Sequence, residues 1–111
     1  MLKAENRLKG QAEFSRILKE GRRSRGQFLL IAAAPRTGDH PRLGVMVGRK
    51  ASKKAVDRNR VRRVVAHLFM HVFNELDGFD VVVSVSRLPS KTVFAALEKD
   101  IEEWRKKLPS S

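Results

Sequence analysis

The stretch RLGVMVGRKASKKAVDRNRVRRVVAHLF, residues 42–69, decides the fold of this 111-residue chain. Its first seven residues carry apolar side chains at alternate positions, and this spacing predicts a β-strand from Arg42 to Gly48. Ser52 is of a residue type that caps helices, and the apolar residues after it recur at helical spacing, so we expect a long helix that ends near Glu75. The apolar stripe of this helix would be Val61, Val64, Val65, Leu68 and Val72.

The residues that follow complete a strand–helix–strand unit. The run FDVVVSVS, residues 79–86, is rich in β-branched side chains and predicts a second strand. This succession favours a parallel pair of strands joined by a crossover helix, and generic chirality would make the crossover right-handed. Ser90 can cap a final helix. The apolar face of that helix would be Val93, Phe94, Leu97, Ile101, Trp104 and Leu108.

Three further segments are expected before residue 42. Residues 11–20 predict a short helix, because apolar side chains recur at i, i+3 and i+4 and a glycine follows as a stop. Residues 22–26 predict a basic loop. Residues 27–34 form a near-continuous apolar run bounded by a glycine and a proline, which predicts a buried strand. We expect this strand to form an antiparallel hairpin with the strand at 42–48.

The expected order of elements is therefore α-β-β-α-β-α. This order predicts an α+β fold, an α/β sandwich in which helices pack on a small mixed sheet. A chain of this length has room for one core, and we expect a single domain over residues 1–111. The apolar content of 41% is ordinary for a globular domain.

The charge of the chain points to a polyanionic partner. Twenty-four Lys and Arg oppose twelve Asp and Glu, which gives a net charge of +12 and a pI near 11.1. This balance favours nucleic acid. No run approaches the ~20 apolar residues of a membrane helix. We do not expect a membrane partner, because the apolar stripe of the basic helix is needed for the core. Cysteine is absent, which excludes disulfides and thiolate metal sites and suits the cytoplasm, where we expect the protein.

Positive charge is concentrated between Arg49 and Arg63, where eight of fifteen residues are Lys or Arg and Asp57 is the only acid. If Val61 faces the core, a helical step of about 100° places Arg58 at the rim of the buried stripe. Guanidinium forks bind phosphate through two parallel hydrogen bonds, and like charges at i, i+4 repel unless a polyanion neutralises them. We therefore expect a face that binds a polyanion, with nucleic acid as the first candidate, formed by Asn59, Arg60, Arg62 and Arg63.

Several short motifs accompany this basic run. Arg58-Asn59-Arg60 and Arg62-Arg63 follow the segment LGVMVGRK at residues 43–50. The other motifs are Asn6-Arg7-Leu8-Lys9, Glu13-Phe14, Gly21, Gln27-Phe28 and Phe79-Asp80-Val81-Val82-Val83. Together they resemble the signature of the ribonuclease P protein family, and the resemblance covers essentially the whole chain.

The resemblance implies an α/β sandwich whose crossover around the arginine helix is left-handed. It implies an RNA-binding subunit of ribonuclease P, which binds the catalytic RNA subunit and the 5′ leader of precursor tRNA and assists endonucleolytic removal of the leader. The RNA subunit would perform the hydrolysis with magnesium, and the protein alone would bind no cofactor or metal. The expected contacts with the RNA subunit are Lys50, Lys53, Lys54, Arg58, Asn59, Arg60, Arg62, Arg63 and His67.

The resemblance also implies a cleft for the leader between the first helix and the sheet. Phe14 matches an aromatic of that cleft, on which an unstacked base could stack. Leu18 and Ile31 stand where the family has further aromatics, and the chain has no tyrosine, so the leader would depend more on shape and charge. By helical spacing alone, Phe14 fits a core position.

Other constellations in the sequence predict no catalytic or metal site in the protein. Asp39-His40 lies in a loop without partners, and His67 and His71 have a zinc-compatible spacing with only Glu75 as a third ligand. Composition leaves two rival functions open. One is a ribosomal-type structural RNA-binding protein, and the other is a DNA-binding regulator. We do not expect DNA as the partner, because no second short helix suggests a helix-turn-helix.

Overall fold

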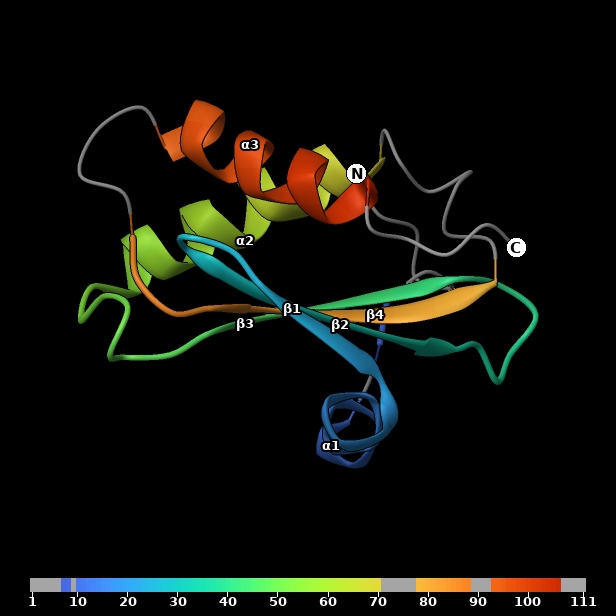
Figure 1. The fold of residues 1–111 in the computed structure, drawn as a ribbon. Coiled ribbons are helices and arrows are strands. Elements are labelled where there is room, and N and C mark those ends of the chain that lie inside the picture. Colours follow the sequence, from blue (N-terminus) through green and yellow to red (C-terminus); the bar gives the residue numbers. More distant parts are fainter. Residues whose placement is uncertain (1–6, 9, 71–77, 89–92, 107–111) are drawn as a thin grey trace.

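The computed structural model describes residues 7–8, 10–70, 78–88 and 93–106, and the order of its elements is α-β-β-β-α-β-α. Helices α2 and α3 cover one face of a four-stranded sheet and α1 covers the other (Figure 1). The α+β sandwich with a small mixed sheet is confirmed. The elements are α1 (Gln11–Glu20), β1 (Arg22–Arg25), β2 (Leu29–Pro35), β3 (Arg42–Val47), α2 (Ala55–Met70), β4 (Phe79–Val85) and α3 (Val93–Lys106).

Strand β4 is central, in a sheet of order β1-β2-β4-β3. It pairs with β3 in parallel and with β2 antiparallel, so the parallel pair predicted on either side of α2 is confirmed. The predicted hairpin between β2 and β3 is wrong, because β4 lies between those two strands. The left hand of the crossover stays a prediction from the resemblance.

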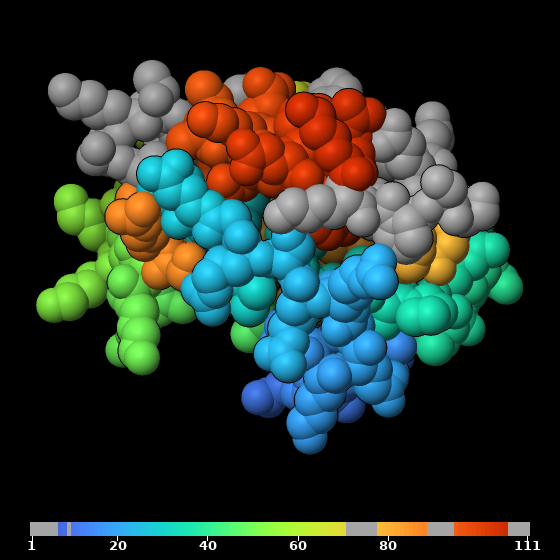
Figure 2. Space-filling model, in the orientation of Figure 1, coloured from blue at the N-terminus to red at the C-terminus, as the bar shows by residue number. Residues whose placement is uncertain are grey.

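Strand β1 corrects the expectation of a basic loop at residues 22–26. It pairs antiparallel with β2, from Arg22 opposite Ala33 to Arg25 opposite Leu30. The pairing joins backbone groups at the edge of the sheet, so it needs no apolar side chains and leaves no periodicity in the sequence. Figure 2 shows this light-blue segment uncovered at the front of the molecule, between α1 and α3.

The sheet has a separate apolar core on each face. The larger core lies under α2 and α3, where the rings of Phe69 and Trp104 are 5.5 Å apart between centroids. Most of the apolar residues predicted to face the core from α2 and α3 lie there. Val72, Glu75, Ser90 and Leu108, which the predictions also named, fall outside the described residues. The smaller core lies under α1 and consists of Leu8, Ile17, Ala32, Ala34 and Val82. No helix among the described residues is long and apolar enough to cross a membrane.

Helix α1 is held to the sheet by a buried ion network centred on Asp80. The Asp80 carboxylate is fully buried and accepts hydrogen bonds from Arg16 Nη2 at 3.0 Å and Arg42 Nη2 at 2.9 Å. Glu13 bridges the same two arginines, 2.9 Å from Arg16 Nε and 3.5 Å from Arg42 Nη2. The hydrogen bond from Arg16 lowers the pKa of Glu13, and the charges of both arginines add to this against desolvation. The network fixes α1 at the ends of β3 and β4.

Candidate nucleic-acid interface

Helix α2 and the turn before it present the predicted basic face to solvent. Lys50, Lys53, Lys54, Asn59, Arg60, Arg62, Arg63 and His67 are exposed, and Arg58 is half-buried. Asp57, the only acid of the run, accepts a hydrogen bond from the Ser52 hydroxyl at 3.4 Å. Within the described part of the chain, none of the eight Lys and Arg residues of this run forms an ion pair. Their charge is therefore available to an external anion.

Local hydrogen bonds orient two side chains of this face. Arg58 Nη1 donates to the Ser52 carbonyl oxygen at 3.0 Å, and Arg62 Nη1 donates to Asn59 Oδ1 at 2.7 Å. The second bond uses the side-chain oxygen of Asn59 and leaves the side-chain NH₂ of the same residue free to donate. The helix begins at Ala55, later than predicted, and the Ser52 hydroxyl accepts from the Lys54 N–H in the preceding turn at 3.3 Å. Arg58 lines a depression of about 480 Å³ with Arg49, Lys50 and Lys53.

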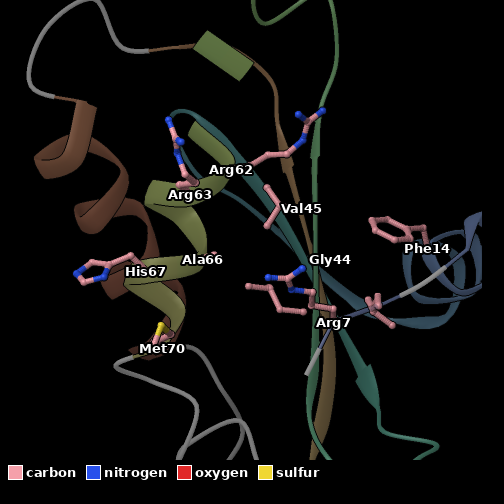
Figure 3. Close-up of a pocket in the computed structure, with 11 residues that line it drawn as sticks. Arg7, Phe14, Gly44, Val45, Arg62, Arg63, Ala66, His67 and Met70 are labelled. Carbon is pink, nitrogen blue, oxygen red and sulfur yellow. The ribbon is translucent and has the colours of Figure 1, made fainter. Parts of the chain in front are cut away.

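A groove runs beside this face along the outer edge of β3. Its deeper part, of about 470 Å³, is lined by α1 and the N-terminal segment on one side and by α2 on the other. Figure 3 shows Phe14 on one side of β3, Arg62, Arg63 and His67 on the other, and Arg7 between them. A second depression continues the groove toward Gly48 and shares Phe14, Val45 and Arg62 with the first. The groove thus joins α1 to the basic helix.

Phe14 occupies this groove because β3 has a glycine opposite it. A Cβ on Gly44 would lie 2.5 Å from Phe14 Cζ, so the ring rests against bare backbone. Phe14 is half-buried and also packs on the smaller core. The two interpretations of Phe14 are therefore compatible, because its side chain packs on the smaller core and also lines the groove.

The other two residues predicted for the leader cleft have different places. Leu18 is half-buried against the smaller core and does not line the groove. Ile31 is only 2% exposed and belongs to the larger core under α2 and α3. Alternate residues of a strand point to opposite faces, so Ile31 faces away from α1 while its neighbour Ala32 faces it. The resemblance implied that Ile31 lines the leader cleft, and this is wrong, because Ile31 lies on the face of β2 that α2 and α3 cover.

Several groove residues were missed by reasoning from sequence. Arg7 forms a bridge with Leu43, and the Leu8 N–H donates to the Leu43 carbonyl at 3.1 Å, which carries the N-terminal segment along β3. Val45 and Met70 line the same groove. Arg7 belongs to a motif that the resemblance includes, but no local pattern marks Val45 or Met70 as groove residues.

The described residues contain no group of three or more His, Cys, Asp or Glu that could hold a metal ion. His67 lies on the groove side of α2, whereas His71 and Glu75 fall outside the described residues. The absence of a catalytic or metal site in this protein stays a prediction. The described surface therefore has a positively charged helix beside a groove that Phe14 lines.

Comparison with known proteins places almost the whole chain in one family. The family model for ribonuclease P matches residues 2–109. The chain is 33% identical over 104 residues to the ribonuclease P protein component of Pseudanabaena sp., covering 92% of this chain and 90% of the relative. It is 37% identical over 92 residues to that of Methylococcus capsulatus, covering 83% and 71%.

Solved structures show the same architecture. The RNase P protein of Staphylococcus aureus superposes with a TM-score of 0.82 at 24% identity, covering 95% of this chain and 96% of that one. The RNase P protein of Thermotoga maritima, solved with 1-(4-fluorophenyl)-2-thiourea, gives a TM-score of 0.77 at 26% identity, covering 93% and 100%. The chain belongs to the ribonuclease P protein family.

Proposed function

We propose that this protein binds the catalytic RNA subunit of ribonuclease P through α2 and the 5′ leader of precursor tRNA through the groove along β3. In this role it assists endonucleolytic removal of the leader, which gives the mature 5′ end of the tRNA. The observation that carries the proposal is the set of arginines on α2, none of which forms an ion pair with a described residue and which lie directly beside the groove.

The basic face suits a folded RNA. Arg60, Arg62 and Arg63 project from one helix, and a helix holds its side chains at fixed spacing. Guanidinium groups at fixed positions can bind several phosphates together, which gives affinity and register. The free NH₂ of Asn59 can donate to a base edge or a 2′-hydroxyl, which adds discrimination that phosphate contacts lack.

The groove suits a single strand better than a duplex. It is bounded by helices on both sides of one strand, so a duplex would meet α1 and α2 before it reached β3. Phe14 offers one aromatic surface for an unstacked base, and Arg7 and Arg62 offer cations for the backbone. Of the three residues predicted for the leader cleft, Phe14 alone lines the groove and alone has an aromatic ring.

Hydrolysis, in this proposal, takes place in the RNA subunit, which would hold the magnesium ions. The chain supplies binding and orientation, since no carboxylate cluster for metal ions occurs in the part that the structure describes. RNA-free protein incubated with labelled precursor tRNA and magnesium should therefore release no leader. Site-specific trimming by that preparation would contradict the division of labour.

The proposal is tested by identifying the RNA that purifies with the protein from its own cells. One discrete RNA of a few hundred nucleotides that cleaves precursor tRNA once reconstituted with this chain would support it. Ribosomal RNA would instead support the structural RNA-binding role. Competition between structured RNA and duplex DNA at matched salt tests the DNA-binding alternative, in which the duplex would compete better.

A further inference from the structure

A second set of arginines lies at the opposite edge of the sheet from the groove. Three of the four residues of β1 are arginines, and all three are exposed. Arg87, which follows β4, is exposed as well. Within the described part of the chain, none of these four arginines forms an ion pair. This surface, which we call the β1 edge, consists of Arg22, Arg23, Arg25 and Arg87.

The β1 edge is rigidly built around a buried carboxylate. Asp100 of α3 is 6% exposed and accepts hydrogen bonds from three consecutive backbone N–H groups, two in the turn between β1 and β2 and one at the first residue of β2. The distances are 3.1 Å from Gln27, 2.7 Å from Phe28 and 3.1 Å from Leu29. A Cβ on Gly26 would lie 2.8 Å from the Asp100 carboxylate, so glycine permits the approach. The turn is thereby fixed to α3.

Arg87 is held over this fixed turn. Its guanidinium carbon lies 5.0 Å from the centre of the Phe28 ring, and its Nε donates to the Gln27 carbonyl oxygen at 3.3 Å. Ser86 fixes the same turn from β4, because its hydroxyl donates to the Phe28 carbonyl oxygen at 2.9 Å. These contacts use one face and one donor of the guanidinium, and its terminal nitrogens stay available to an anion.

The strand sets the spacing and direction of the other three arginines. Residues paired across strands project to the same face, so Arg23 and Arg25 follow Ala32 and Leu30 toward the α1 side, while Arg22 follows Ala33 toward α3. Arg23 and Arg25 are two residues apart, about 7 Å along the strand. Two guanidinium groups at such a spacing can bind neighbouring phosphates of one nucleic-acid strand.

We propose that the β1 edge is a second phosphate-binding surface for RNA, so that the protein contacts two RNA segments at opposite edges of its sheet. The proposal rests on RNA being the partner, as in the proposed function. The second segment belongs to the RNA subunit or to the precursor tRNA, which present the same phosphate chemistry. A structural role also exists for charged edge strands, which prevent sheets from pairing edge to edge, and the experiment must separate the two roles.

The first experiment measures affinity and its salt dependence for Arg23→Ala/Arg25→Ala. The probes are a transcript of the ribonuclease P RNA and, with that RNA already bound, a precursor tRNA transcript. The matched control is Lys19→Ala/Lys106→Ala, which removes the same charge from two other exposed positions. The β1 variant should lose about tenfold in affinity for one probe, and its log–log salt slope should fall by about 1.5, while the control changes little.

The transcript for which the β1 variant loses affinity identifies the source of the second RNA segment. If both variants bind both probes alike, the β1 edge is not an RNA surface, and aggregation of the β1 variant alone would then mark the arginines as edge protection. Failure of the unmodified protein to bind either transcript would instead contradict the proposed function itself. The two failures are therefore distinguishable.

A second experiment leaves every arginine in place. The chain has no cysteine, so Gln27→Cys, Val56→Cys and Gly38→Cys each provide one attachment point for a tethered iron chelate that cleaves nearby RNA. Val56 is 74% exposed on α2, and a side chain at Gly38 would meet no atom within 4 Å. The chelate at position 27 should cleave RNA at nucleotides distinct from those that the chelate at position 56 cleaves. Cleavage from position 27 no stronger than from position 38 would overturn the proposal.

Discussion

Two groups of arginines in this protein have opposite surroundings. Arg16 and Arg42 converge on the buried carboxylate of Asp80 and share Glu13, whereas the arginines of α2 have no acidic partner among the described residues. The contrast indicates that the first group stabilises the fold and the second is available to RNA. Stability and RNA binding should therefore respond to different substitutions, although both groups consist of the same side chain.

The largest effect is expected for Asp80→Ala. It leaves Arg16 and Arg42 without their buried partner, and removing one member of a buried ion pair costs up to about 3–5 kcal/mol. Both arginines keep more than a fifth of their side-chain surface exposed and can be partly rehydrated, so we expect about 2–4 kcal/mol. Urea unfolding measures this loss. A variant with unchanged stability would show that Arg16 and Arg42 do not stabilise the fold through Asp80.

The converse effect is expected for Arg58→Ala/Asn59→Ala/Arg60→Ala. Affinity for the RNA subunit should fall at least about tenfold, because phosphate forks and a polar donor leave together. Stability should fall by only about 1 kcal/mol, mainly from the Arg58 bond to the Ser52 carbonyl. Filter binding and urea unfolding on one preparation give both values, with Lys19→Ala/Lys106→Ala as the charge-matched control. A triple variant with a much lower free energy of unfolding would show that the arginines of α2 also stabilise the fold.

Phe14→Ala tests a residue that lies next to Glu13 on α1 and also lines the groove beside α2. If the ring stacks on a leader base, affinity for tRNA with a leader should fall about five- to a hundredfold, while affinity for mature tRNA is unchanged. Phe14→Leu is the control, because it fills the space over Gly44 without an aromatic face. Equal loss for both tRNAs together with a lower melting temperature would assign Phe14 to the core alone.

The smallest effect is expected for Glu13→Gln. The pKa of Glu13 is lowered in the folded protein, so its contribution to stability is complete above its ordinary value of 4.5 and is lost as the pH falls through the lowered value. Gln cannot ionise and should flatten the pH dependence of the melting temperature below 4.5, with little change at pH 7. An unaltered acid profile would show that Glu13 adds nothing to the Asp80 network.

Periodicity predicted most of the fold because most elements bury one face. It failed for β1, whose side chains are polar and whose stability comes from backbone pairing with β2. It could not check the place that the resemblance gave to Ile31, because β2 is apolar on both faces, and it paired β2 with β3, because the intervening strand comes later in the chain. The basic face was predictable from charge alone. The roles of Asp80 and Asp100 were not, because several of their partners lie 38 to 73 residues away.

The central position of β4 has a consequence for how this protein is made. The strand that joins β2 to β3 is synthesised after both of them, so in a nascent chain that ends at residue 70 the β1–β2 pair and β3 cannot yet form one sheet. Helix α2 is complete by then, but the sheet face it covers does not exist. Long-range pairing closes late and slowly. All residues that line the groove are synthesised by then, but Asp80 of β4 joins α1 to β3 through Arg16 and Arg42. The arginines of α2 therefore leave the ribosome before the groove beside them has its final shape.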